Sequence, residues 1–308
     1  MFLSRFIAQR DSPLYTSDQT GNKVLATTIT ITGTGCPIPS ATRSGPGVLV
    51  QTDEVALQFD AGRGTTQRLA NCELWPTDLD AFFVTHHHSD HLVGLADLLL
   101  TRWVMDRTDR ISDLPVIVPE GPAKKFVNHV LDAWSDDIAI RKEHAQRSND
   151  PGIEILSFSA SNEVNEVWSM GEVKVLACKV RHEPVFPAVG YRIESPDGVI
   201  AITGDTLVCD EVTELAAGAD VLIYEAMRFE EIQILPKKRR FILDYHADTR
   251  LIGSQAKEIG VPTLILTHLI PEPLSDEDRQ AFIDDIRVGG FTGELIVADD
   301  LDSVTLGK

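Results

Sequence analysis

The chain has 308 residues, 43% hydrophobic and 24% charged, a balance typical of soluble globular proteins that bury a sizeable core. Its formal net charge of −19 argues against a broad basic face for nucleic acid, although bound divalent cations would make one cleft locally positive. The apolar runs are no longer than strands, so no membrane partner is expected.

The N-terminal residues and the cysteines bear on where the protein works. Residues 1–22 are predicted to be an N-terminal extension, and they contain no apolar stretch of signal-peptide length. The four cysteines are scattered and form no C-x-x-C pair, which indicates reduced thiols rather than a disulfide framework (Cys36, Cys72, Cys178 and Cys209). We therefore expect a cytoplasmic protein.

The N-terminal half of the chain is predicted to contain hairpin strands and then helices. Period-2 alternation and short apolar runs predict strands over residues 24–32, 47–52, 55–60 and 79–84. Helical patterns reach Leu69 and return over residues 92–107 and 122–134. The polar segment 141–150 is predicted to be a loop.

The C-terminal half is predicted to contain further strands, with a helix over residues 251–259. The strands are predicted over residues 173–180, 189–193, 199–202, 221–224, 263–266, 295–298 and 303–306. Hairpins that are followed by alternating strands and helices indicate an α/β protein with sheets covered by helices. No internal repeat or low-complexity linker divides the chain, so we expect one domain over residues 1–308.

A cluster of metal-ligand residue types follows the strand predicted over residues 79–84. His86 and His88 occupy alternate positions, so in an extended segment they point the same way and can share one ion. Asp90 and His91 lie where the chain turns and can bind a second ion, whereas His87 points away. Imidazole and carboxylate groups suit zinc, iron or manganese. A fortuitous histidine-rich loop or a surface pH sensor is the alternative.

The run from His86 to His91 matches the HxHxDH signature of the metallo-β-lactamase superfamily. Further motifs resemble those of its tRNase Z-like branch and follow in the right order: Thr32–Ser40, Phe59–Thr65, Arg181–Pro184, Gly190–Arg192, Gly204–Thr206, Tyr245–Asp248 and Thr267–Leu269. The segment Phe59–Thr65 departs from the branch pattern FDCGEGT at Ala61 and Arg63. This resemblance, over residues 27–271, implies a four-layer αββα sandwich of two mixed sheets with helices outside.

The resemblance also implies a centre for two divalent metal ions, with Zn²⁺ expected and Mn²⁺ or Fe²⁺ as alternatives. Its implied ligands are His86, His88 and His182 for the first ion, Asp90, His91 and His268 for the second, and Asp205 as the bridge. Asp90 and His246 are the candidate catalytic residues, Asp90 to orient the attacking water and His246 as the general acid. Asp60 is a candidate partner of a ligand histidine. Core histidines and a simple turn at Asp205 are the alternatives.

The rim of the site bears on the substrate. Enzymes of this branch that process tRNA carry a long arm rich in glycine and proline, but only residues 193–203 separate Arg192 from Gly204 here. This short hairpin and the acidic balance favour a small-molecule substrate and make nucleic acid the weaker candidate. We therefore expect hydrolysis of a carboxylic ester, lactone, phosphodiester or sulfate ester by metal-activated hydroxide. A tRNase Z-type endoribonuclease that processes tRNA 3′ ends is the alternative.

The segment 227–245 is a candidate lid insertion beside the predicted metal centre. It combines apolar residues with a basic run, so its candidate substrate contacts are Phe229, Lys237, Lys238 and Arg239. An amphipathic surface or a dimer contact is an equal alternative, and a homodimer is expected.

Two other functions are less well supported by the sequence. A two-iron redox protein would need an electron-carrying module that these residues do not provide, and a catalytically silent relative would not keep a complete ligand set.

Overall fold

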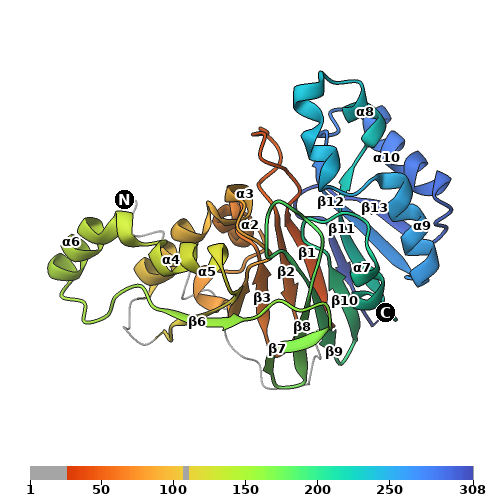
Figure 1. Ribbon diagram of the computed structural model, residues 1–308. Helices are drawn as coiled ribbons and strands as arrows, with labels where there is room; N and C mark the ends of the chain where they lie inside the picture. The colour runs from red at the N-terminus through yellow and green to blue at the C-terminus, as the bar shows by residue number, and fades with distance from the viewer. Residues whose placement is uncertain (1–25, 107–110, 308) are drawn as a thin grey trace.

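The computed structural model describes residues 26–106 and 111–307, and the predicted extension 1–22 lies outside them. The described strands form two seven-stranded sheets, which are stacked face to face with helices on both outer sides (Figure 1). Within the described residues, no helix is long and apolar enough to cross a bilayer. The expected homodimer stays a prediction.

The first sheet has the strand order β14-β1-β2-β3-β4-β5-β6. Its strands are β1 (Thr28–Gly33), β2 (Gly47–Gln51), β3 (Ala56–Phe59), β4 (Ala81–Phe83), β5 (Leu114–Pro119), β6 (Ile153–Phe158) and β14 (Ser303–Thr305). The strands from β14 to β3 pair antiparallel, and those from β3 to β6 pair parallel. The sheet is therefore mixed.

The second sheet has the order β13-β12-β11-β10-β9-β8-β7. Its strands are β7 (Asn165–Met170), β8 (Val173–Lys179), β9 (Val189–Ser195), β10 (Gly198–Ile202), β11 (Val221–Met227), β12 (Thr263–Ile270) and β13 (Glu294–Val297). Here β7 to β10 pair antiparallel and β10 to β13 pair parallel. Each sheet thus has a parallel half, and the carboxyl ends of those strands carry the site.

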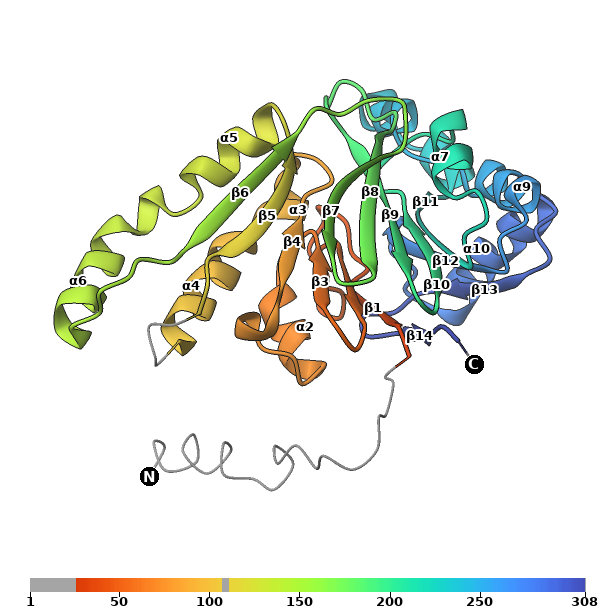
Figure 2. The same ribbon diagram turned by 90° about the horizontal axis from the view of Figure 1, so that it is seen from below.

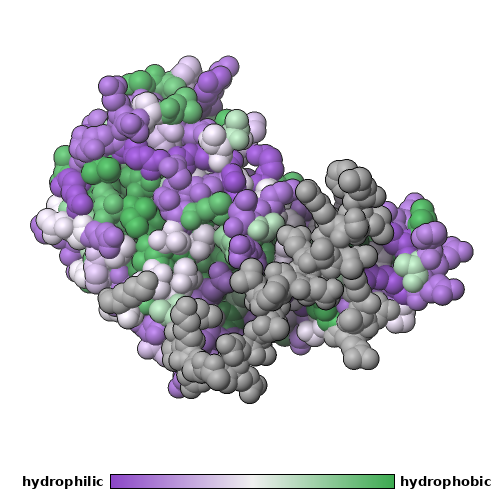
Figure 3. Space-filling view, turned by 180° about the vertical axis from the view of Figure 1, so that it is seen from behind, coloured by the Kyte–Doolittle hydropathy of each residue, from purple (hydrophilic) through white to green (hydrophobic). Residues whose placement is uncertain are grey.

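The helices divide between the two outer faces (Figure 2). Beside the first sheet are α2 (Thr65–Asn71), η2 (Pro76–Asp78), α3 (Ser89–Leu92), α4 (Leu95–Met105), α5 (Pro122–His129), η3 (Asp132–Trp134) and α6 (Ser135–Ala145). Beside the second are α7 (Asp210–Leu215), α8 (Phe229–Gln233), η4 (Lys237–Asp244), α9 (Thr249–Ile259) and α10 (Asp276–Val288). Seen from behind, hydrophobic residues gather on the side of the C-terminal elements (Figure 3).

The main core lies between the two sheets. Phe59 and Phe83 stack with ring centroids 4.6 Å apart, and Tyr191 from the opposite sheet contacts both rings. One further apolar cluster joins the first sheet to α4 and α5, and another joins the second sheet to α7, α9 and α10. These three clusters define helix, sheet, sheet and helix layers, so the predicted αββα sandwich is confirmed.

The loop prediction over residues 141–150 is wrong for its first half and right for residues 146–150, and some elements have weak sequence patterns. The predicted loop 141–150 begins inside α6, a largely exposed helix in which Asp137 and Arg141 form an ion pair at 2.8 Å one turn apart. Such a helix is polar on most sides, so it lacks the apolar stripe that identifies a helix in a sequence. Strands β6 and β7 are half-exposed edge strands, and the alternation of their residues is correspondingly weak.

Candidate metal centre

The predicted ligands come together where the parallel strands of both sheets end. His86 and His88 follow β4, Asp90 and His91 belong to α3, His182 follows β8, Asp205 follows β10, and His268 lies in β12. Most of the ligand-type atoms fall into two groups, one with His86, His88, His182 and Asp205 and one with Asp90, His91 and His268. A third possible group, Asp205, His246 and His268, overlaps both. Within each group these atoms lie within 4.8 Å of one another.

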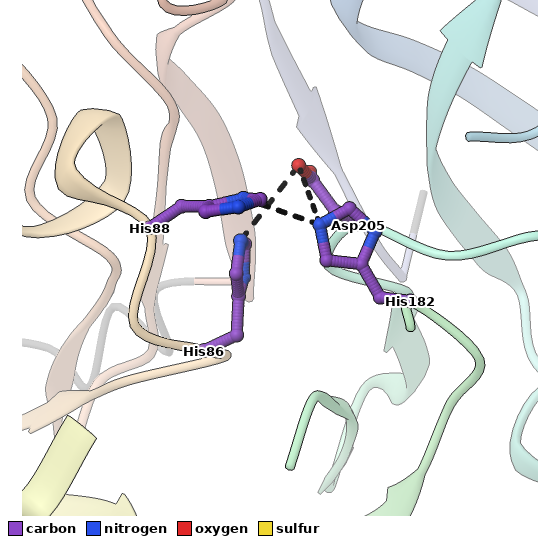
Figure 4. A group of neighbouring side chains, drawn as sticks. All are labelled: His86, His88, His182 and Asp205. Atoms are coloured by element: carbon purple, nitrogen blue, oxygen red, sulfur yellow. Dashed lines mark hydrogen bonds and ion pairs between the residues drawn. The ribbon is translucent and has the colours of Figure 1, made fainter. Parts of the chain in front are cut away.

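The first group converges on one carboxylate oxygen (Figure 4). The Nε2 atoms of His86 and His182 each lie 3.8 Å from Asp205 Oδ2. His88, on the same loop as His86, points toward the same place, with its Nδ1 atom 3.2 Å from His182 Nε2 (Figure 4). Three imidazole nitrogens and a carboxylate are therefore directed at a common point.

The second group approaches the same carboxylate from the other side. His91 Nε2 and His268 Nε2 lie 3.4 Å and 3.5 Å from Asp205 Oδ2. Asp90 Oδ2 lies 3.3 Å from His268 Nε2 and 3.8 Å from His91 Nε2. Asp205 is thus shared by both groups, which is the position expected for a bridging ligand.

Local backbone geometry turns two of these residues into the site. His268 is skipped in the pairing of β11 with β12, where Glu225 pairs with Thr267 and Ala226 with Leu269, and its φ is 46°. A bulge of this kind re-aims one side chain of a strand. Gly204, which precedes Asp205, has a φ of 61°, and a Cβ atom there would lie 3.0 Å from the Cβ atom of Thr85. Only glycine fits that turn without strain.

Hydrogen bonds on the far side of the rings fix the ligand histidines. Asp60 Oδ2 accepts from His91 Nδ1 at 2.7 Å and from the Thr85 hydroxyl at 2.7 Å. Because that hydroxyl donates to Asp60, it accepts from His86 Nδ1 at 3.0 Å. His182 Nδ1 donates to the carbonyl of Tyr245 at 2.8 Å. In all three histidines the proton is held on Nδ1, which leaves Nε2 free for a metal ion.

The charge states fit that arrangement. Burial holds the pKa of His86 well below its usual value and lowers that of His88 to about 4. Both rings are therefore neutral at pH 7, and each can donate a nitrogen lone pair to a metal ion. Burial opposes charge on His91 as well, but Asp205 and Asp60 outweigh it and hold its pKa well above the usual value, so a metal ion bound at Nε2 would take the place of the second ring proton. Burial likewise opposes ionisation of Asp205, yet His268 and His91 hold its pKa well below the usual range. The centre therefore attracts positive charge.

Unpaired buried atoms are a direct test of whether metal ions fit. Among the described residues, His86 Nε2 and His91 Nε2 are buried and make no hydrogen bond, although both face Asp205. Leaving such an atom unsatisfied costs about 1–3 kcal/mol. Divalent cations would satisfy these atoms, and nitrogen and carboxylate donors are suitable ligands for them. The donor set of the cluster therefore fits divalent metal ions.

His246 is joined to a residue that sequence reasoning missed. Glu225 of β11 is 2% exposed, and its Oε1 atom accepts from His246 Nδ1 at 2.9 Å and from the backbone N–H groups of Thr206 and Ala247. Burial opposes charge on His246, but Glu225 raises its pKa to about 9. The sequence signal for Glu225 is a charged residue inside the apolar run Val221–Met227.

The remaining candidates lie at the rim. Phe229 is half-buried in an apolar cluster with Met227 and Ile232, and its predicted contact with substrate stays a prediction. The other three predicted substrate contacts, Lys237, Lys238 and Arg239, are exposed on η4, which leads directly into Tyr245 and His246. His87 belongs to neither group of ligand atoms.

Comparison with known proteins places this geometry in a family. The family model described as "Beta-lactamase superfamily domain" matches residues 57–269. Ribonuclease Z of Mycobacterium bovis (strain BCG / Pasteur 1173P2) is 36% identical over 280 residues, which are 90% of this chain and 97% of that protein. Ribonuclease Z of Mycolicibacterium gilvum (strain PYR-GCK) is 36% identical over 282 residues, which are 90% of this chain and 95% of that protein.

Solved structures agree on the fold. A metallo-beta-lactamase fold protein, YhfI from Bacillus subtilis, superposes with a TM-score of 0.68 at 19% identity, covering 90% of this chain and 99% of that one. Human tRNase Z, short form, superposes with a TM-score of 0.64 at 21% identity, covering 91% of this chain and 99% of that one. At these identities the likeness shows the fold alone.

The relatives overturn two predictions made from the sequence. The small-molecule ester substrate and the small-molecule partner are wrong, because the relatives at 36% identity carry the name Ribonuclease Z. The short hairpin that β9 and β10 form was one reason to disfavour RNA, together with the acidic balance of the chain. The chain nevertheless covers 97% of one such relative, so this hairpin does not separate it from proteins of that name. The chain is a hydrolase of the metallo-β-lactamase superfamily and belongs to its ribonuclease Z-like branch.

Proposed function

We propose that the protein is a tRNase Z-type endoribonuclease that removes 3′ trailers from tRNA precursors. The observation that carries this proposal is the 36% identity to proteins named Ribonuclease Z across 90% of the chain. The site supports it, because a centre for divalent cations next to a protonated histidine suits the hydrolysis of a phosphodiester bond.

We propose the same metal ligands that the sequence motifs implied, and we expect two Zn²⁺ ions. His86, His88 and His182 would hold one ion, Asp90, His91 and His268 the other, and Asp205 would join them. When bound, the ions would supply Lewis-acid polarisation of the phosphoryl oxygens and would lower the pKa of water. Asp60, Thr85 and the Tyr245 carbonyl keep the ligand rings oriented through their hydrogen bonds.

Asp90 is proposed to orient the attacking water. Burial opposes its ionisation, but a hydrogen bond from His268 and the charge of His91 hold the pKa of Asp90 below its usual value. At neutral pH it is a carboxylate, which accepts a hydrogen bond from water or takes up its proton. Its Oδ2 atom lies 3.8 Å from His91 Nε2 and 3.3 Å from His268 Nε2, which supports this role.

His246 is proposed to donate the proton to the leaving oxygen. Its pKa of about 9 makes it an imidazolium at neutral pH, with Nδ1–H held by Glu225. Nε2 then carries the proton that is available to the leaving group. A positively charged ring 4.0 Å from Asp205 would also stabilise negative charge that develops on the phosphoryl group.

A cleavage assay tests this function. The full chain, supplied with Zn²⁺ or Mn²⁺, is incubated with a tRNA precursor that carries a 3′ trailer, and the new 3′ end is mapped. We expect one main cut near the end of the acceptor stem, and no cut with Asp205→Asn or after chelation. Failure of the metal-loaded chain to cut any precursor would overturn the proposal.

A further inference from the structure

Four consecutive cations, Lys237 to Arg240, are exposed on η4 in a chain whose formal net charge is −19. Among the described residues, no carboxylate lies within ion-pairing distance of any of the four. Nearby arginines differ, because Arg228 pairs with Asp285 at 3.0 Å and Arg250 pairs with Glu230. An acidic protein that leaves four consecutive cations unneutralised near its centre presents a site for an anionic partner.

The basic run is held in place by its apolar side. Leu235, Ile242 and Leu243 pack against the cluster that contains Cys36, Met227, Ile232 and Ile270. Arg240 Nε donates to the carbonyl of Leu235 at 2.6 Å, and the Arg239 backbone N–H donates to the carbonyl of Pro236 at 2.8 Å. Leu235, Ile242 and Leu243 therefore face inward while the lysines and arginines face outward, so the cations have a defined position.

Aromatic rings connect this run to the metal centre. Phe241, which is 58% exposed, has its ring centroid 6.2 Å from that of Tyr245. The half-buried Tyr245 ring lies 5.0 Å from the His182 ring and 6.5 Å from the His88 ring. A path of rings thus leads from two predicted metal ligands to the exposed cations.

We propose that Lys237, Lys238, Arg239, Phe241 and Tyr245 form the docking surface for the single-stranded part of the RNA beside the scissile bond. The cations bind successive phosphates, and the two rings stack on the neighbouring bases. Several adjacent cations suit a polyanion, and exposed rings next to them suit unpaired bases, which is the usual combination in proteins that bind single strands. This inference rests on the proposed ribonuclease function.

A matched pair of variants tests the cations. Lys237→Gln/Lys238→Gln removes two charges from η4, and Lys125→Gln/Lys257→Gln removes two exposed charges from α5 and α9, outside η4. For cleavage of a tRNA precursor we expect the first variant to raise KM about tenfold, with kcat within about twofold. The slope of log(kcat/KM) against log salt should become shallower by about 0.7 for each lost phosphate contact. The control variant should keep the wild-type KM and slope.

A second pair tests the stacking. Phe241→Leu keeps an apolar side chain but removes the ring, and we expect KM to rise about tenfold. Phe241→Tyr keeps the ring and should restore a KM close to that of the wild type. Melting temperatures of all variants, compared with the wild type, show that each is folded.

The outcomes separate this inference from the function on which it rests. If the wild type cleaves the precursor but Lys237→Gln/Lys238→Gln matches the control variant in KM and salt slope, the docking surface is wrong and the ribonuclease function stands. If Phe241→Leu and Phe241→Tyr behave alike, the stacking part is wrong. If the metal-loaded wild type cuts no precursor, the ribonuclease function fails and this inference fails with it.

Discussion

The metal centre and the η4 rim are adjacent, but their side chains are held in opposite ways. In the centre, Asp205 lies among five histidines. Asp60 and Glu225 orient two of these rings by accepting hydrogen bonds from their Nδ1 atoms. On the rim, the four cations of η4 are exposed and, within the described residues, lack ion-pair partners. Buried polar groups are fixed by their neighbours, whereas exposed charges remain available to a partner. The buried residues of the centre are those proposed to perform the chemistry, and the exposed cations of η4 are those proposed to bind the RNA.

The largest expected effect comes from the residue that both ligand groups share. Asp205→Asn keeps the size of the side chain but removes its negative charge, which five histidines surround. We expect precursor cleavage to fall to background and the bound metal per chain to decrease, measured by elemental analysis. A variant that retained both full metal content and activity would contradict the role of Asp205 as the bridge.

The next largest effect concerns His246 and the Glu225 that holds it. We expect His246→Gln to lower kcat about 10²–10⁴-fold, the usual contribution of a general acid.

Glu225→Gln should change the pH dependence of cleavage. In the wild type the acid form of His246 persists up to its pKa of about 9, so activity falls as pH rises above that value. Without the Glu225 carboxylate, burial lowers the pKa of His246, and the loss should begin at lower pH. An alkaline limb unchanged in Glu225→Gln would argue against this pairing.

A smaller effect is expected from the partner of His91. Asp60→Asn weakens the acceptor that holds His91 Nδ1 at 2.7 Å and the Thr85 hydroxyl at 2.7 Å. Supporting residues of this kind contribute about 10–100-fold to metal affinity. We expect that loss in a competition titration against a chelator, with activity restored by excess metal. Equal metal affinity of Asp60→Asn and the wild type would show that the site does not depend on this hydrogen bond.

The smallest expected effect is on stability, where a substitution on the η4 rim should matter much less than one in the core between the sheets. Lys238→Gln should change the free energy of unfolding by less than about 0.5 kcal/mol, because the side chain is exposed and unpaired. Phe83→Ala, between the two sheets, should cost about 3–5 kcal/mol. Urea denaturation measures both. A large destabilisation by Lys238→Gln would mean that the basic run has a structural role.

Much of the fold could be predicted from the sequence, and so could the candidate ligands that the fold brings together, because both depend on local patterns. Alternation identified most strands, and ordered motifs identified His182, Asp205 and His268 although they lie far from His86 in the chain. The substrate prediction failed for a different reason. It relied on net charge, which is a property of the whole chain, and on the length of one hairpin, whereas the proposed docking surface depends on where a few exposed cations lie.

The amino-acid order by itself determined the ligand types, their motif and the strands that deliver them, since these depend on residue spacing. Only the tertiary structure decided which side chains meet. It brought Glu225 of β11 to His246, placed the Tyr245 carbonyl on His182, and turned His268 inward through a bulge. It also joined the basic run to the metal centre through Tyr245 and Phe241. These contacts connect residues on different elements, so no local pattern in the sequence could specify them.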